Sequence, residues 1–537
     1  MKKFLFLFTG VLLLASAARA TEYTNPIIHA DYSDPDAIRV GDDFYMISSS
    51  FNRAPALPIL HSRDLVHWRL IGHVLQNLVP DSRYRVPQHG NGVWAPTLRY
   101  HAGRFWVFYP DPDQGIFVTS AQSMRGPWSE PHLLLPGKGI IDPAPLWDDD
   151  GKAYLIHAWA KSRAGFNNVL TLHRMSSDAR EILDRGRVII DGNKLPGYRT
   201  LEGPKLYKRN GFYYVFAPAG GVTQGWQAVF RAKNIAGPYA AKVVLAQGST
   251  PVNGPHQGAW VETAAGEDWF LHFQDKDAYG RIVHLQPMQW RHGWPVIGAD
   301  ADGDGRGEPV LRHRAPQVTE SSAGGYPAVA DEFSAQRLQP QWQWNANWRA
   351  GWYSLTANPG YLRLFAQPAA QQDANLWQQP ALLLQKFPAE QFRVHTRLRL
   401  HGAEAEAGLL LYGTDYAWLG LRRRGDNNQL IYNVCIGARS GCKTHEVVVA
   451  ELPQARVEVG LSVFPGHRAI FSFRNAGGTW HTLNEGFIAR PGRWVGASFG
   501  LFALGDDGYA DFDYLKTGEL QRAAVMPGNG LQRSIID

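Results

Sequence analysis

The chain has 537 residues, which is more than one domain of typical size holds, so two domains are expected. Aromatic residues make up 12% of the sequence and charged residues only 19%, which favours a folded, β-rich protein over a disordered one. The formal charge of +6 is modest and no long basic run occurs, so nucleic acid is not expected as a partner.

Residues 1–20 are predicted to be a signal peptide. Lys2 and Lys3 precede the apolar run FLFLFTGVLLLA, and the small residues that end at Ala20 fit a cleavage site. A membrane anchor is the less favoured alternative, because the run is short and no later apolar stretch of about 18 residues follows. The mature protein is therefore expected in the periplasm or outside the cell, free of the membrane after cleavage.

One sequence phrase occurs five times in the first half of the chain. Each copy carries a proline beside its head, then an apolar strand, a glycine turn and a second, aromatic strand. The copies are headed by Asp34, Trp94–Ala95, Asp142, Glu202 and His256–Gln257. The heads are 48 to 60 residues apart, with further strand-like runs between them, which is the pattern of four-stranded propeller blades. The sequence predicts a five-bladed β-propeller over residues 21–312.

The rest of the chain is also predicted to be β-structure. A Gly- and Ser-rich linker is expected at 313–330, and short alternating strands with regular turn signals over 331–520 indicate a β-sandwich. Residues 521–537 are left as a tail. The fold class is thus all-β.

Three acidic heads of the repeat suggest a chemistry. The first strand of each blade lines the channel of a propeller, so Asp34, Asp142 and Glu202 are expected to meet there. Like charges and burial separate the pKa values of such a group, which suits the acid and base roles of glycoside hydrolysis. The alternative is that each acid caps a turn beside its proline, which is less favoured for three matched positions than for one.

The motifs that carry these residues resemble glycoside hydrolase family 43. They are NPIIHADYSDPDAIRVGDDFYMISSSF, LPILHSRDLVHW, GVWAPTLRY, IIDPAPLWDDDGKAYL, LEGPKLYKRNGFYY and GPHQGAWVET, in chain order. The segment from DEFS to DFDYLK resembles the sandwich of the β-xylosidase branch. The resemblance implies an exo-acting, inverting hydrolase of plant cell-wall oligosaccharides that releases β-D-xylose. Because SSSFNRAPALP departs from the xylosidase pattern, release of α-L-arabinofuranose remains a close alternative.

The resemblance also implies roles for the three acids. Asp34 matches the general base that activates water, Glu202 the general acid, and Asp142 the carboxylate that tunes and orients the acid. Two alternatives of another class stay open at this point. A non-catalytic carbohydrate-binding propeller has no need of all three acids, and a retaining sucrose- or fructan-type hydrolase needs an opening phrase that is not found here.

Four further residues match substrate-binding positions of the family. Trp94 heads its blade and is expected to form an aromatic wall of the sugar subsite, and Phe51 matches a pocket aromatic of the family; for both, an aromatic packed within the propeller is an equally open alternative. Arg281 matches an arginine that reaches a sugar hydroxyl, with a surface ion pair as the less favoured alternative. His256 matches a histidine near the channel axis, where some relatives hold calcium or water. The oligosaccharide substrate is the expected partner, and the sequence indicates no oligomeric state.

No metal or other cofactor is expected to be required, although the resemblance allows calcium near His256. A single histidine is a poor calcium site on its own. The segment DADGDGRGE resembles the start of a calcium loop, but Leu311 stands where the loop needs a glutamate, so a Gly/Asp turn is favoured.

The only cysteines are Cys435 and Cys442, in YNVCIGARSGCKTHE. Strand-like runs flank the turn between them, so the two face each other across a hairpin in this interpretation. In an exported protein this spacing predicts a disulfide.

Overall fold

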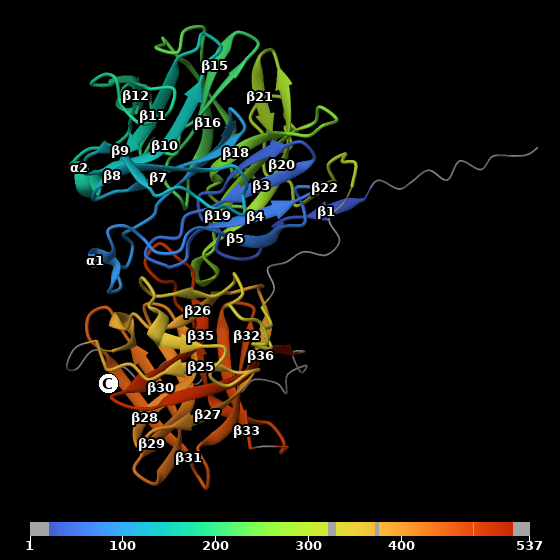
Figure 1. Cartoon of the computed structure of the whole chain (residues 1–537). Helices are drawn as coiled ribbons and strands as arrows, with labels where there is room; N and C mark the ends of the chain where they lie inside the picture. Colours follow the sequence, from blue (N-terminus) through green and yellow to red (C-terminus); the bar gives the residue numbers. More distant parts are fainter. Residues whose placement is uncertain (1–20, 321–328, 371–374, 476, 519–537) are drawn as a thin grey trace, which may run out of the picture.

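The computed structural model describes residues 21–320, 329–370, 375–475 and 477–518. The predicted signal peptide and C-terminal tail lie outside these ranges. Figure 1 shows two β-domains stacked on one another, the first coloured blue to yellow-green and the second yellow to red. The predicted all-β fold, a five-bladed propeller followed by a sandwich, is confirmed.

The propeller consists of five four-stranded antiparallel sheets, each with its strands in chain order. Blade 1 is β2 (Asp36–Val40), β3 (Asp43–Ile47), β4 (Ala56–Ser62) and β5 (Arg69–Leu75); blade 2 is β6 (Thr97–His101), β7 (Arg104–Asp111), β8 (Gly115–Ala121) and β9 (His132–Pro136). Blade 3 is β10 (Ile140–Trp147), β11 (Ala153–Trp159), β12 (Val169–Met175) and β13 (Arg187–Asp191). Blade 4 is β14 (Lys205–Arg209), β15 (Phe212–Ala219), β16 (Trp226–Ala232) and β17 (Ala240–Leu245); blade 5 is β18 (His256–Glu262), β19 (Asp268–Asp275), β20 (Arg281–Arg291) and β21 (Trp294–Ile297).

The glycine of the repeated phrase turns the chain between the first two strands of every blade. All five of these glycines have φ between +64° and +79°, a region that side chains other than glycine rarely adopt. They are Gly41, Gly103, Gly151, Gly211 and Gly266. The first strands contact one another in order from β2 to β14, and β18 contacts β2. The residues just before these strands are therefore brought to one end of a closed ring.

The ring is closed by the segment that precedes blade 1. Strand β1 (Glu22–Thr24) pairs with β22 (Arg312–Arg314), beyond blade 5. The Asn25 side chain donates hydrogen bonds to the carbonyl oxygens of Leu285 (2.7 Å) and Val310 (2.8 Å). Blades 1 and 5 consequently share one apolar core.

The second domain is a sandwich of two seven-stranded sheets around one large apolar core. One sheet contains, in spatial order, β23 (Gln343–Trp344), β26 (Leu383–Lys386), β35 (Ser498–Gly505), β28 (Glu404–Tyr412), β29 (Tyr416–Arg424), β30 (Asn427–Ile436) and β31 (Lys443–Leu452). The other contains β24 (Tyr353–Ser354), β25 (Leu362–Phe365), β36 (Tyr509–Gly518), β27 (Phe392–His401), β32 (Arg456–Phe464), β33 (Arg468–Arg474) and β34 (His481–Ile488). Side chains of β27 alternate between buried and more exposed positions, as a strand with one face on a core requires.

Helices are short in the described part of the chain. They are α1 (Asp81–Tyr84), α2 (Lys161–Ala164) and the 3₁₀ turns Gly192–Lys194, Asp277–Tyr279, Ala350–Trp352 and Leu376–Gln378. Among the residues described, none of these helices has the length and apolar character needed to cross a membrane.

The two domains pack through buried polar contacts. Arg53 and Asn52 of the propeller donate to the side-chain and backbone oxygens of Asn345, at 2.9 and 2.7 Å. The ring of His89 stacks on Trp377 with centroids 3.7 Å apart. The sandwich is therefore fixed against the propeller and is not a freely tethered module.

The two cysteines lie at the end of β30 and beyond the following turn. They form a disulfide, with Cα atoms 5.4 Å apart. This separation lies within the usual range for such bonds.

Candidate active site

The backbone presents two of the acids in an uncommon conformation. Asp34 and Asp142 each precede a proline and have φ of +55°. Such a conformation is rare for residues other than glycine and costs about 1–3 kcal/mol, so it clusters at functional sites. In blade 4 the residue before the proline is Gly203, with φ of +58°, and Glu202 stands one position earlier. The third acid therefore enters the ring in a different register from the two aspartates.

Asp34 is held by two donors at the start of blade 1. Its side chain is buried, and the Ser49 hydroxyl donates to Oδ2. The Arg281 guanidinium, at the start of β20, donates to Oδ1 at 3.2 Å. A carboxylate fixed by a cation and a hydroxyl has a defined orientation, which a base that abstracts a proton from water needs.

Asp142 is buried, and its pKa is strongly shifted by its surroundings. Burial, followed by the charges of Glu202 and Asp34, raises its pKa to about 8. The Gly203 N–H donates to Oδ2 at 2.8 Å and, with Lys205, opposes that rise. The carboxylates that sequence reasoning brought together are thus close enough to interact, and the group holds a proton at neutral pH.

Glu202 is the more accessible of the two interacting acids. Its side chain is 23% exposed, whereas residue Asp142 is 4% exposed. Its Oε1 lies 2.9 Å from Nε2 of His256, a fully buried histidine at the start of β18. The contact fixes the carboxyl group while leaving part of it open to a ligand.

The two predicted aromatic residues also lie together. The rings of Phe51 and Trp94 are 6.4 Å apart, and the backbone of Phe51 pairs with that of Val93. The Trp94 indole donates to the Gly90 carbonyl at 3.0 Å, and the Arg163 guanidinium lies 5.4 Å from its ring centre. Phe51 is buried and Trp94 is half-buried, so Trp94 is the better placed to meet a sugar.

A tryptophan of the sandwich reaches the same site, which the sequence did not reveal. Trp494 is 42% exposed, and its ring centre lies 5.8 Å from the Arg281 guanidinium that holds Asp34. It also borders Gly90, where an added Cβ would lie 3.0 Å from the indole. Both domains therefore border the site.

Lys205 is a second residue that sequence reasoning missed. It is buried at the start of β14, and its ammonium donates to the Pro96 carbonyl (2.8 Å) and the Thr97 hydroxyl (2.6 Å). Burial lowers the pKa of Lys205, and the nearby Asp36 charge opposes that effect. A cation beneath the acids limits how far their mutual repulsion raises the pKa of Asp142.

The residues around His256 do not fit a protein-held calcium ion. Calcium takes six to eight oxygen ligands. His256 offers one nitrogen, Nδ1, which is buried without a hydrogen-bond partner, while Nε2 faces Glu202. In the described ranges, the only cluster of three or more His, Cys, Asp or Glu side chains close enough to share an ion lies elsewhere.

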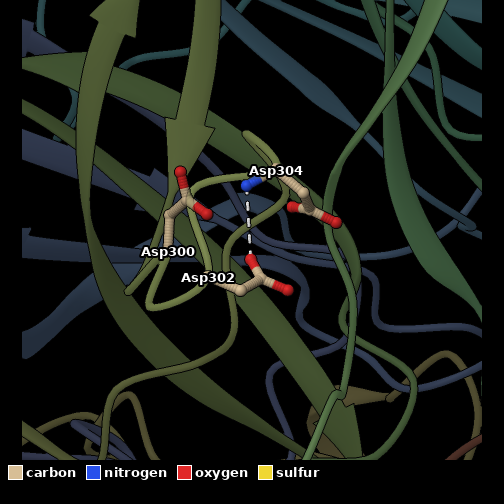
Figure 2. A group of neighbouring side chains, drawn as sticks. All are labelled: Asp300, Asp302 and Asp304. Atoms are coloured by element: carbon tan, nitrogen blue, oxygen red, sulfur yellow. Dashed lines mark hydrogen bonds between the residues drawn. The ribbon is translucent and has the colours of Figure 1, made fainter.

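That cluster is Asp300, Asp302 and Asp304, beyond blade 5 (Figure 2). The Asp304 N–H donates to Asp302, and Asp304 in turn accepts from the Arg306 N–H at 2.7 Å. Asp300 pairs with Arg291 at 2.9 Å. Contacts within the loop and with Arg291 hold this segment, for which the sequence predicts a Gly/Asp turn.

The family model for glycosyl hydrolases family 43 matches residues 23–295, which contain all three acids. The chain belongs to glycoside hydrolase family 43. It is therefore a glycoside hydrolase, as the motifs indicated. A second model, for the beta xylosidase C-terminal concanavalin A-like domain, matches residues 330–517.

Relatives within the family match along most of their length. A protein of Xylanibacter ruminicola is 40% identical over 403 residues, which cover 75% of this chain and 73% of that protein. A beta-xylosidase of Formosa agariphila is 31% identical, with 92% of this chain and 89% of that protein covered. The crystal structure of a xylan beta-1,4-xylosidase from Bacillus halodurans superposes with a TM-score of 0.79 at 25% identity, covering 92% of this chain and all of that one.

Proposed function

We propose that this family 43 enzyme is an exo-acting, inverting β-xylosidase that releases terminal D-xylose from plant cell-wall oligosaccharides. The observation that carries the proposal is the group formed by Asp34, Asp142 and Glu202, in which one carboxyl holds a proton and another is oriented by two donors. Relatives named as beta-xylosidases that match over both domains support the choice of sugar.

In this proposal Asp34 is the general base. Ser49 and Arg281 orient its carboxylate, so one oxygen is directed to a water on one side of the sugar. The water attacks the anomeric carbon as its proton passes to Asp34. No covalent bond forms between enzyme and sugar, and the anomeric configuration is inverted.

Glu202 is the general acid. Its carboxyl is partly open to the channel, whereas Asp142 is enclosed, so Glu202 is the group that reaches the leaving oxygen. The pair formed by Asp142 and Glu202 retains one proton, and Glu202 donates it to the leaving oxygen as the glycosidic bond breaks. Asp142, through Gly203, fixes the backbone beside the acid. His256 orients the Glu202 side chain.

Release of α-L-arabinofuranose is the second candidate. A non-reducing end alpha-L-arabinofuranosidase of Bacteroides ovatus is 30% identical, with 67% of this chain and 68% of that protein covered. Rates on aryl β-D-xyloside and aryl α-L-arabinofuranoside, measured side by side, separate the two. A higher kcat/KM for the arabinofuranoside would overturn the xylosidase assignment, and Asp34→Ala serves as the inactive control.

We also propose that the enzyme acts in the periplasm or outside the cell. The basic start, apolar run and small-residue site within residues 1–20 support this location. N-terminal sequencing of the protein recovered from a bacterial host is expected to begin at Thr21. Recovery of an uncleaved chain in the cytoplasm would contradict it.

A further inference from the structure

Asp31 bridges the propeller and the sandwich beside the active site. Its side chain is buried, three residues before Asp34. Oδ1 accepts from the backbone N–H of Arg281 at 2.9 Å, and Oδ2 accepts from the backbone N–H of Gly496 at 3.0 Å. Its carbonyl oxygen accepts from the Lys386 ammonium at 2.7 Å. One residue thus binds blade 5 and two separate segments of the sandwich.

The two backbone N–H groups that donate to the Asp31 carboxylate each lead to the reaction site, and the Ser33 hydroxyl is a third donor, to Oδ1 at 3.3 Å. Arg281 donates through its side chain to Asp34. Gly496 ends the sandwich segment 490–496, which presents Trp494 beside the Arg281 guanidinium. Within the described residues, the hydrogen bonds of Asp31 go to Ser33, Arg281, Lys386 and Gly496 and not to the three acids, so we expect its effect on the acids to pass through these neighbours.

The backbones meet closely at this point. A Cβ on Gly496 would lie 2.8 Å from the Gly280 nitrogen and 2.9 Å from the Tyr279 carbonyl carbon. A Cβ on Gly280 would lie 2.5 Å from Cγ of Asp31. The next residue, Ala497, donates to the Ala278 carbonyl at 2.7 Å. Because backbone faces backbone without intervening side chains, a small shift of segment 490–496 is transmitted to the start of β20.

We propose that Asp31 is a positioning residue. It fixes the position of Arg281 relative to Trp494 of the sandwich and, through Arg281, the position of Asp34. A carboxylate is suited to this task because it accepts on both oxygens from two backbone N–H groups. An asparagine has the same shape, but only its oxygen accepts hydrogen bonds. Its NH₂ group would face one of the two backbone N–H donors, and that hydrogen bond would be lost. The inference rests on the proposed function only for its kinetic readout.

The test compares Asp31→Asn with wild type and with Glu390→Gln. Glu390 forms another contact between the domains, an exposed ion pair with Lys276 at 3.2 Å, and lies outside the proposed site. Asp31→Asn is expected to lower kcat/KM about 10- to 100-fold, as misplacement near 1 Å does. Glu390→Gln is expected to match wild type.

Two readouts separate positioning from general loss of structure. Combined with Trp494→Ala, the effect of Asp31→Asn on kcat/KM is expected to be smaller than the product of the two single effects, since both act through one segment. Trypsin cleavage after the exposed Arg493 is expected to be faster in Asp31→Asn than in wild type, because the segment opens more often. This second readout needs no substrate.

Wild-type kcat/KM in Asp31→Asn, or effects that multiply fully with Trp494→Ala, would overturn the inference. If Asp31→Asn does not fold, Gly496→Ala replaces it, because the added methyl displaces the same segment; unchanged cleavage at Arg493 would then refute the inference. If the wild type hydrolyses neither aryl pentoside, the proposed function fails, and the cleavage rates alone judge the role of Asp31.

Discussion

The backbone N–H of Gly203 donates a 2.8 Å hydrogen bond to Oδ2 of Asp142, so the enclosed carboxyl is tied to the residue that follows Glu202. Two acids from neighbouring blades therefore keep a fixed separation although they stand 60 positions apart in the sequence. Because the two carboxyl groups cannot move apart, one of them keeps a proton, which relieves their repulsion. The charge of the site therefore depends on pH.

Asp142 should make the native state less stable as the pH rises. Its pKa is raised from 3.8 to about 8 on folding, so between these values the native state holds a proton that the unfolded chain has lost. The stability it provides is fully present below about pH 4 and is lost as the pH rises through about 8. As the pH rises from about 5 to about 8, the unfolding free energy of Asp142→Asn should therefore increase relative to that of wild type, by on the order of a few kcal/mol.

Urea unfolding of both proteins at the two pH values measures this difference. Equal pH dependence in the two proteins would show that Asp142 is ionised in the native state. In wild type, kcat/KM should fall above about pH 8, as the proton held by the site is lost.

Glu202→Gln should lower hydrolysis of substrates with poor leaving groups by about 10²–10⁴-fold, because acid assistance is lost. Aryl glycosides with activated leaving groups need less protonation and should lose less. The comparison of kcat/KM on xylobiose and on a nitrophenyl xyloside measures the effect. Equal losses on both substrates would contradict the role of Glu202.

Trp494→Ala should raise KM for xylo-oligosaccharides by roughly 3- to 10-fold, because a factor of this size corresponds to the free energy of one aromatic contact. Trp494→Phe, which keeps a ring beside Arg281, is the matched control and should stay near wild type. Initial-rate kinetics on xylobiose measure both variants. An unchanged KM in Trp494→Ala would place the ring outside the path of the substrate.

The disulfide should support the sandwich without affecting catalysis. Replacing Cys435 and Cys442 by alanine should cost about 2–3 kcal/mol of unfolding free energy, the value for a short loop. Activity at moderate temperature should persist, because the bond lies in the sandwich. Urea unfolding with and without reductant measures the loss, and two free thiols titrated in the native exported protein would contradict the bond.

The product should first appear with inverted anomeric configuration. Water must fit between Asp34 and the sugar, so the carboxyls of Asp34 and Glu202 should stand about 6.5–9.5 Å apart rather than the 5–5.5 Å of retaining enzymes. Asp34→Ala should abolish turnover and leave sugar binding largely intact. Proton NMR before mutarotation reads the configuration, and a retained anomer would refute the mechanism while leaving the family assignment in place.

The repeat made much of the propeller predictable. Its glycine turns and proline-flanked heads set the blade period, and the closed ring then brings three distant acids together. Ser49 was also within reach, because the hairpin register counted from the Gly41 turn places it opposite Asp34.

Asp31 and Trp494 were beyond sequence reasoning for a physical reason. Their contacts join the propeller to the sandwich, Asp31 to Gly496 and Trp494 to Arg281, and no periodicity relates the two domains. The docking of one domain on the other is set by buried polar pairs such as Arg53 with Asn345, each of which is an ordinary loop residue in the sequence.

The pairing of β1 with β22 has a consequence for the order in which the chain folds. The first strand finds its partner only after some 290 residues have followed it, so blade 1 remains with an open core until blade 5 has been synthesised. Contacts this distant along the chain slow folding, because the chain loses the entropy of closing a long loop before the contact can stabilise it. A chain cut after blade 4 should accordingly collapse without acquiring a stable ring, and the segment around Ile28 would be left without the strand that covers it.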